Sequence, residues 1–152
     1  WEIDTVIGKN HKGALVTMND RKTGLVKIKK VVNKEAETVA KSAIEAMMPF
    51  KKLLHTITAD NGKEFALHQK ISEALKISFY FAKPYHSWER GANENTNGLI
   101  RQYFPKKTDF ATITDEQVQW VEDKLNNRPR KRLDFLTPNQ IYNQTEKVAF
   151  TT

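Results

Sequence analysis

The beginning of the chain alternates apolar and polar residues with the period of β-strands. Three runs are rich in Val, Ile and Thr, which favour strands: Trp1–Gly8, Gly13–Met18 and Leu25–Val32. A polar loop that ends in Gly24 separates the second run from the third and is typical of a hairpin. The pattern therefore predicts three consecutive strands.

The apolar spacing then changes to that of a helix. From Lys34 to Met48 apolar residues recur every three to four positions, until Pro49 interrupts the pattern. The following segments predict, in order, a strand at Leu54–Thr58, a helix at Lys63–Leu75, a strand at Ile77–Phe81 and a helix at Asn93–Tyr103.

Two more helices are predicted by their start signals. Thr114 and Gln117 form a capping box, and Pro138 follows Thr137 at a first helical position. Three strands followed by alternating helices and strands predict an α/β fold with a mixed five-stranded sheet and helices on both faces.

Length and composition are those of one folded domain. The 152 residues are 39% hydrophobic and 28% charged, which excludes a disordered chain, and no apolar run is long enough for a membrane span. The absence of cysteine excludes disulfides, a thiol nucleophile and a zinc finger. We expect a core over residues 1–145 and a mobile tail over 146–152. Because the chain opens at Trp1 inside a strand, without Met or a signal peptide, we expect it to be a piece of a longer protein.

The charge balance favours a polyanionic partner. The net charge is +7, and Lys and Arg contacts with phosphates release condensed counterions. Four basic residues lie close together: Arg128, Arg130, Lys131 and Arg132. The alternative is that such clusters are ordinary solvated faces.

Three acids stand at positions that the fold alone does not explain. Asp4 interrupts an apolar strand, unless that strand is an exposed edge. Asp60 follows the fourth strand, where open α/β sheets bind their ligands, although it is also a good turn or cap residue. Glu94 lies in the first turn of a helix, where an acid also complements the helix dipole.

Taken together, the three acids suit a pair of divalent metal ions. Hydrolysis of a phosphodiester uses two such ions about 3.5–4 Å apart, and Mg²⁺ prefers hard oxygen ligands. Without a cation, two carboxylates about 4 Å apart repel by roughly 4 kcal/mol at an effective dielectric constant of about 20. A purely structural core would not gather them.

The segments around these acids resemble a known family. Thr58–Ala66 and Trp88–Pro105, together with Asn126–Lys131 and Leu136–Pro138, are similar to the DDE catalytic core of insertion-sequence-thirty transposases, which are related to retroviral integrases. The resemblance implies a ribonuclease-H-like fold.

The same resemblance implies the chemistry. Asp4, Asp60 and Glu94 would be the catalytic acids and would hold two Mg²⁺ (or Mn²⁺) ions. The reaction would be cleavage of DNA at the ends of a mobile element, followed by transfer of the freed 3′-hydroxyl into target DNA. The protein would act in the bacterial cytoplasm, at the nucleoid, as a homo-oligomer on DNA. It would need no membrane and no nucleotide cofactor, and its end-recognition domain would lie upstream, outside this chain.

Basic and aromatic residues near the acids are candidate DNA contacts. Arg90 fits the family pattern, and Arg101 stands where Lys is usual, while Ser87 replaces a usual Tyr. Trp88 is a candidate for stacking on a base, with plain packing as the alternative. Lys63, beside Asp60, is a candidate for contacting DNA. The basic cluster would hold the backbone without reading sequence: Arg128, Arg130, Lys131 and Arg132.

Two other functions remain open at this point. The first is a metal-dependent nuclease of the same fold that cuts without joining. The second is a DNA-binding module without chemistry, against which the intact acids argue. No Walker motif and no Gly-x-Ser-x-Gly elbow occurs, so NTP-driven and acyl-transfer chemistry are not indicated.

Overall fold

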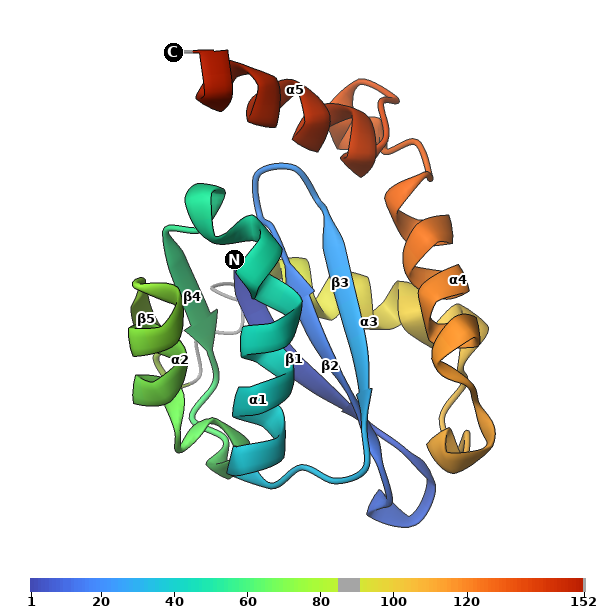
Figure 1. Ribbon diagram of the computed structural model, residues 1–152. Coiled ribbons are helices and arrows are strands. Elements are labelled where there is room, and N and C mark those ends of the chain that lie inside the picture. Colours follow the sequence, from blue (N-terminus) through green and yellow to red (C-terminus); the bar gives the residue numbers. More distant parts are fainter. Residues whose placement is uncertain (85–90, 152) are drawn as a thin grey trace.

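The computed structural model describes residues 1–84 and 91–151, which form a five-stranded mixed sheet flanked by helices (Figure 1). The strands are β1 (Glu2–Ile7), β2 (Ala14–Asn19), β3 (Val26–Val31), β4 (Thr56–Ala59) and β5 (Ser78–Phe81). Their order across the sheet is β3-β2-β1-β4-β5. β2 runs antiparallel to both of its neighbours, β1 and β3, while β4 lies parallel to β1, and β5 parallel to β4. β1 is therefore the central strand.

Helices cover both faces of this sheet. They are α1 (Ala36–Met47), α2 (His68–Leu75), α3 (Gly91–Tyr103), α4 (Asp115–Asn126) and α5 (Pro138–Thr151). One apolar core joins α1 and α2 to one face, through buried residues such as Ile3 and Val16. A second core joins α3 and α4 to the other face, through Val6 and Leu15. Figure 1 shows α1 on one side of the sheet and α3 on the other. The predicted α/β architecture is confirmed.

Side chains of α4 close one border of the sheet. The side chain of Asn126 accepts a hydrogen bond from the backbone N–H of Val26 at 2.8 Å and donates one to its carbonyl oxygen, also at 2.8 Å. The carboxylate of Glu122, which is buried, accepts a bond of 2.8 Å from the N–H of Ile28. These groups satisfy backbone positions that the outer strand β3 would otherwise leave open.

Short 3₁₀ helices account for the differences from the predicted boundaries. They are Lys9–His11, Met48–Leu53, Lys63–Phe65, Phe110–Thr112 and Lys131–Leu133. The helix predicted from Lys63 to Leu75 is split in two, because Leu67 leaves helical geometry (φ −96°, ψ 29°) just before α2. β4 begins later than predicted, since the turn that contains Pro49 runs on to Leu53.

The end of the chain is helical. α5 continues through Thr151 across the stretch that the sequence suggested as a tail, and the mobility of that stretch stays a prediction. Within residues 1–84 and 91–151, no helix combines the length and hydropathy that a membrane span requires.

Candidate active site

Asp4 lies on the central strand and is half-buried. β1 pairs with β2 on one side and β4 on the other, which excludes the alternative that Asp4 belongs to an exposed edge strand. Its Oδ1 accepts a hydrogen bond of 2.8 Å from the N–H of Thr5, and its Oδ2 accepts one of 3.0 Å from Nδ2 of Asn97 in α3. Both carboxylate oxygens are therefore held in defined positions.

Asp60 follows the carboxyl end of β4, as predicted. Its Oδ1 accepts a hydrogen bond of 2.9 Å from the N–H of Gly62, so Asp60 does shape the turn. It does not cap the following α-helix, which begins only at His68 after Leu67. The turn leaves the second carboxylate oxygen, Oδ2, outside this hydrogen bond.

The sheet register brings these two acids to the same level. Glu2 of β1 is paired with Thr58 of β4, and the strands run in the same direction. Asp4 and Asp60 each follow two residues later, Asp4 within β1 and Asp60 one residue beyond the end of β4. Because neighbouring strands are about 4.8 Å apart, this arrangement suits two carboxylates that share a cation.

Glu94 is carried by α3, which is fastened to the same central strand. The N–H of Asn93 donates to Glu2 Oε2 at 2.8 Å, and the side chain of Asn93 donates to the carbonyl oxygen of Ile3 at 3.3 Å. One turn further on, Asn97 contacts Asp4. Glu94 lies between these two anchors, in the first turn of the helix, and its side chain is exposed.

The three acids do not form a closed metal cage. Among the described residues, no three His, Cys, Asp or Glu side chains are grouped closely enough to hold a metal ion together. The structure therefore places Asp4 on β1 and Asp60 directly after the neighbouring strand β4, and ties the helix of Glu94 to Asp4. Oxygen ligands of this type fit Mg²⁺ or Mn²⁺, with Glu94 completing the set if its side chain turns inward.

A further acid, Glu64, lies beside Asp60. The point where a Cβ would stand at Gly62 contacts the Glu64 carboxylate and is 2.8 Å from Asp60 Oδ1, so a side chain at residue 62 would require these carboxylates to shift. Glu64 also accepts a bond of 3.0 Å from Oγ1 of Thr5 and forms an ion pair of 3.5 Å with Lys34. Its place beside Asp60 makes Glu64 a candidate for orienting a metal ion there.

Asn97 was not singled out from the sequence. It follows Glu94 by three residues, a spacing that places two side chains on one flank of a helix. That spacing was the available signal, but a hydrogen bond to Asp4 depends on how α3 crosses β1, which the sequence does not reveal.

The predicted DNA contacts are placed in different surroundings. Lys63, Arg128, Lys131 and Arg132 are exposed. Arg101 is half-buried and donates to the carbonyl oxygen of Ile7 at 3.0 Å, and burial lowers the pKa of its guanidinium. Arg90, Trp88 and Ser87 lie outside the described residues. The arrangement of these side chains does not show whether they contact DNA, so all of these contacts remain predictions.

Arg130 lies deeper in the basic cluster. Its guanidinium donates to the carbonyl oxygens of Leu125 at 2.8 Å and Arg128 at 3.3 Å. Burial, followed by the charges of Arg128 and Arg132, lowers its pKa. The cluster therefore holds like charges close together on a fixed backbone.

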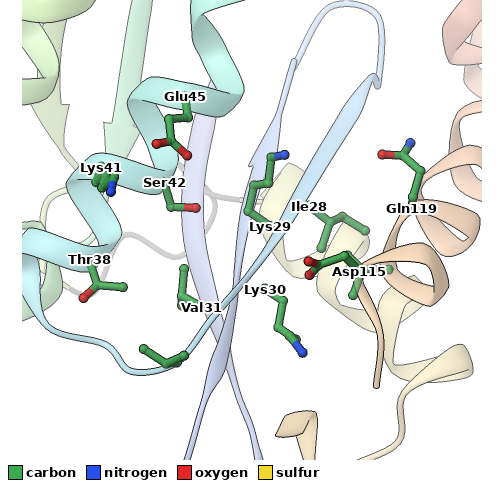
Figure 2. A pocket seen from close by; sticks show the side chains of 12 residues that line it. Ile28, Lys29, Lys30, Val31, Thr38, Lys41, Ser42, Glu45, Asp115 and Gln119 are labelled. Atoms are coloured by element: carbon green, nitrogen blue, oxygen red, sulfur yellow. The ribbon is translucent and has the colours of Figure 1, made fainter. Parts of the chain in front are cut away.

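A hollow of about 520 Å³ lies away from these acids, between α1, β3 and the start of α4 (Figure 2). Figure 2 shows Lys29 and Lys41 on its lining together with Glu45 and Asp115. Its lining mixes both signs of charge and includes none of the three predicted acids. We therefore place the candidate chemistry at Asp4 and Asp60, where the sheet geometry favours it.

Known transposases are similar in sequence to this chain. The transposase of insertion sequence element IS4351 from Bacteroides fragilis is 65% identical over 143 residues, which are 94% of this chain and 44% of that protein. The transposase InsI of IS30A from Escherichia coli K12 is 39% identical over 142 residues, which are 93% of this chain and 37% of that protein. The chain thus spans less than half the length of these curated relatives. No model of a protein family matches it.

Solved structures of retroviral integrases share the fold. The catalytic core domain of BIV integrase superposes with a TM-score of 0.73 at 19% identity, covering 99% of this chain and 97% of that one. The HTLV-2 integrase catalytic core domain in complex with magnesium has a TM-score of 0.68 at 22% identity, covering 93% of each chain. The homologues of this chain are therefore transposases of the IS30 family, and its fold is the ribonuclease-H-like fold of integrase catalytic cores.

Proposed function

We propose that this chain is the catalytic core of a DDE transposase, which cuts DNA at the ends of a mobile element and joins the freed 3′-hydroxyl to target DNA. The observation that carries the proposal is that Asp4 on β1 and Asp60 directly after β4 each lie two residues beyond the paired residues of these neighbouring parallel strands, Glu2 and Thr58. The helix of Glu94 is fastened to Asp4 by Asn97. The transposase identity of its homologues agrees with this chemistry.

Asp4, Asp60 and Glu94 would hold two Mg²⁺ or Mn²⁺ ions. Such a pair, when bound, lowers the pKa of the attacking water and stabilises charge on the leaving oxygen. The description of the HTLV-2 integrase core as a magnesium complex supports this choice of ion. The chain's own contribution is orientation: Asn97 fixes one oxygen of Asp4, and the N–H of Gly62 fixes one oxygen of Asp60. Glu94 would turn from solvent toward the pair.

DNA is the proposed substrate. The net charge of +7 favours a polyanion. The exposed Lys and Arg side chains on the loop after α4 would bind backbone phosphates. Arg90, Arg101, Lys63 and Trp88 are proposed as further contacts near the acids. A relative described as an intasome, from simian T-cell lymphotropic virus, supports action as a multimer on DNA. Action at the bacterial nucleoid belongs to the same proposal.

Two alternatives use parts of the same geometry. A nuclease that cuts without joining would need the same acids and ions, because both steps are in-line displacements at phosphorus. A silent DNA-binding module would need only the basic surfaces. The fixed orientation of Asp4 and Asp60 favours chemistry over the silent module, because a DNA-binding surface gains nothing from neighbouring carboxylates.

A joining assay separates these functions. The chain is mixed with a labelled duplex that has a recessed 3′-hydroxyl end, with supercoiled plasmid and with Mn²⁺. Label that enters the plasmid supports the transposase, whereas nicked plasmid without label indicates the nuclease. Plasmid binding with neither product indicates the silent module. Asp4→Asn must abolish both products, since activity that survives this change would place the chemistry elsewhere.

A further inference from the structure

A cavity lined with arginines lies on the other flank of α3. It has a volume of about 360 Å³ and is bounded by the β2–β3 hairpin, the first turns of α3 and the basic loop after α4. Arg21, Arg130 and Arg132 line it, and none of the described residues on its lining is an acid. Small residues such as Gly24 and Ala92 leave its floor open to a ligand.

The arginine charges exceed what the surrounding acids balance. Arg21 forms an ion pair of 3.0 Å with Glu2, whose other carboxylate oxygen accepts the N–H of Asn93. Neither Arg130 nor Arg132 forms an ion pair within residues 1–84 and 91–151. Two of the five N–H donors of Arg130 reach carbonyl oxygens. The remaining donors are suited to the oxygens of a phosphate.

The guanidinium of Arg132 lies close to the β2–β3 hairpin. A Cβ at Gly24 would stand 2.9 Å from Nη2 of Arg132, and the φ of +77° at Gly24 also disfavours a side chain there. Glycine at residue 24 therefore leaves room for the guanidinium beside the hairpin backbone. Arg132 lines the cavity without an acidic partner among residues 1–84 and 91–151.

Polar groups of the floor complete the site. Asn19, which is 4% exposed, donates to the carbonyl oxygen of Ala92 at 3.0 Å and to Oγ1 of Thr96. Its Oδ1 has no hydrogen-bond partner among the described residues. A buried acceptor of this kind is usually met by water, and interfaces with DNA are rich in bridging waters.

The cavity and the acids lie on opposite flanks of one helix. Asn93, Thr96 and Ile100 form the buried face of α3. Ala92 and Asn95 line the cavity on one flank, and the helical repeat puts Glu94 and Asn97 on the other. A helix is about 10 Å across, so the cavity and the acids are separated by about the width of α3.

We infer that this cavity binds a backbone phosphate of the DNA strand, on the opposite flank of α3 from the phosphate that reacts at the acids. The inference deepens the proposed function, on which it rests for the identity of the strand. Arg132 and Arg130 would grip the phosphate, with Arg21 at the rim. A phosphate held here would fix the position of the strand across the first turn of α3.

Amide-resolved NMR of the whole chain tests the inference, with EDTA present so that metal at the acids does not contribute. The probes are a short single-stranded oligodeoxynucleotide and inorganic phosphate. We expect the oligonucleotide to shift the amide signals of Gly24, Ala92 and Thr96. Arg132→Gln should weaken this binding about tenfold, the loss expected for one charge-assisted hydrogen bond, and Arg132→Lys should weaken it less.

Lys41→Gln is the matched control, because it removes the same charge from an exposed position of α1 that does not line the cavity. Equal weakening by Lys41→Gln and Arg132→Gln would overturn the inference, as would unshifted signals in the unaltered chain. Signal shifts that inorganic phosphate causes and the oligonucleotide does not would also overturn it. Asp60→Asn should retain the signal shifts while it loses DNA cleavage. A failure of the proposed catalysis is thereby separated from a failure of the phosphate site.

Discussion

Asn97 of α3 donates a hydrogen bond of 3.0 Å to Oδ2 of Asp4 on the central strand. The same amide accepts a bond of 3.3 Å from Oγ1 of Thr17 on β2. One side chain thus connects the helix of Glu94 to two strands and orients the carboxylate of Asp4. Groups that orient a metal ligand commonly matter nearly as much as the ligand itself.

Asn97→Ala should therefore reduce DNA cleavage by about 10- to 100-fold and lower the free energy of unfolding by only about 1 kcal/mol. Plasmid nicking with Mn²⁺ and urea unfolding measure the two effects. Asn143→Ala, at an exposed position of α5, is the control and should change neither. Nicking at the normal rate in Asn97→Ala would show that Asp4 needs no such support.

Asp60→Asn should abolish cleavage without lowering the melting temperature in metal-free buffer. The amide can still accept the N–H of Gly62, and the change removes repulsion between Asp60 and the nearby Glu64. Nicking and thermal unfolding are measured on the same preparation. Asp109→Asn is a matched control, because Asp109 makes the same type of turn bond, with Ala111, away from the acids. A large loss of stability in Asp60→Asn alone would indicate a structural role.

Replacing Arg128 and Arg130 together with Ala should weaken DNA binding to a similar extent for every sequence tested. It should also reduce the slope of log K against log salt by about 2, at roughly 0.9 for each phosphate that is no longer neutralised. Fluorescence anisotropy over a salt series measures both. The charge-matched control is Lys41→Ala with Lys70→Ala, at exposed positions of α1 and α2. An unchanged slope in the arginine variant would remove the loop from the DNA surface.

Asn126→Ala should lower the free energy of unfolding by about 2–4 kcal/mol. The change leaves the buried N–H and carbonyl oxygen of Val26 without partners, and each unsatisfied group costs about 1–3 kcal/mol. Asn126→Asp keeps the acceptor but loses the donor, so its loss should be intermediate. Urea unfolding of the three proteins gives the order, and equal stability of all three would contradict the account.

Tyr142 should make stability depend on pH in the alkaline range. Its ring contacts Phe50 at a centroid distance of 5.5 Å. Burial, followed by the charges of Glu146 and Asp20, raises its pKa from 10.0 to about 12. Below pH 10 the phenol is protonated in both states. Between pH 10 and about 12 the unfolded chain loses a proton that the folded chain keeps, so stability falls as pH rises.

Tyr142→Phe should therefore lose less stability across this interval than the unaltered chain. Urea unfolding at a series of alkaline pH values gives the comparison, and Tyr80→Phe, at an exposed tyrosine, is the control. An identical pH profile for Tyr142→Phe and the unaltered chain would contradict the shift.

The strands and the helices could be predicted because their signals are local. The period of apolar residues marks β1 to β3 and α1, and the capping box of Thr114 opens α4 as expected. Asp60 was placed by the rule that ligands lie at the carboxyl ends of strands. That Asp4 lies at the level of Asp60 depends on the pairing of Glu2 with Thr58, which no local pattern reveals.

The approach of Glu94 to the pair could not be settled from the sequence either. It depends on the crossing of α3 over β1 and on a side chain that the structure leaves in solvent. The arginine cavity could not be predicted from the sequence either. Arg21 and Arg132 are far apart in the chain, and they line one cavity because the Arg132 guanidinium lies beside Gly24 of the hairpin. Residue types within a local motif could be predicted from the sequence, whereas distances between remote segments could not.

The closure of β3 by α4 limits how this protein can polymerise. A fibril that grows by strand addition needs two exposed sheet edges on every subunit. One edge pairs with the previous copy, and the other pairs with the next. Here Asn126 and Glu122 occupy the first of these. Strand exchange between copies would thus end at a pair, so continued growth into an amyloid-like fibril is not expected.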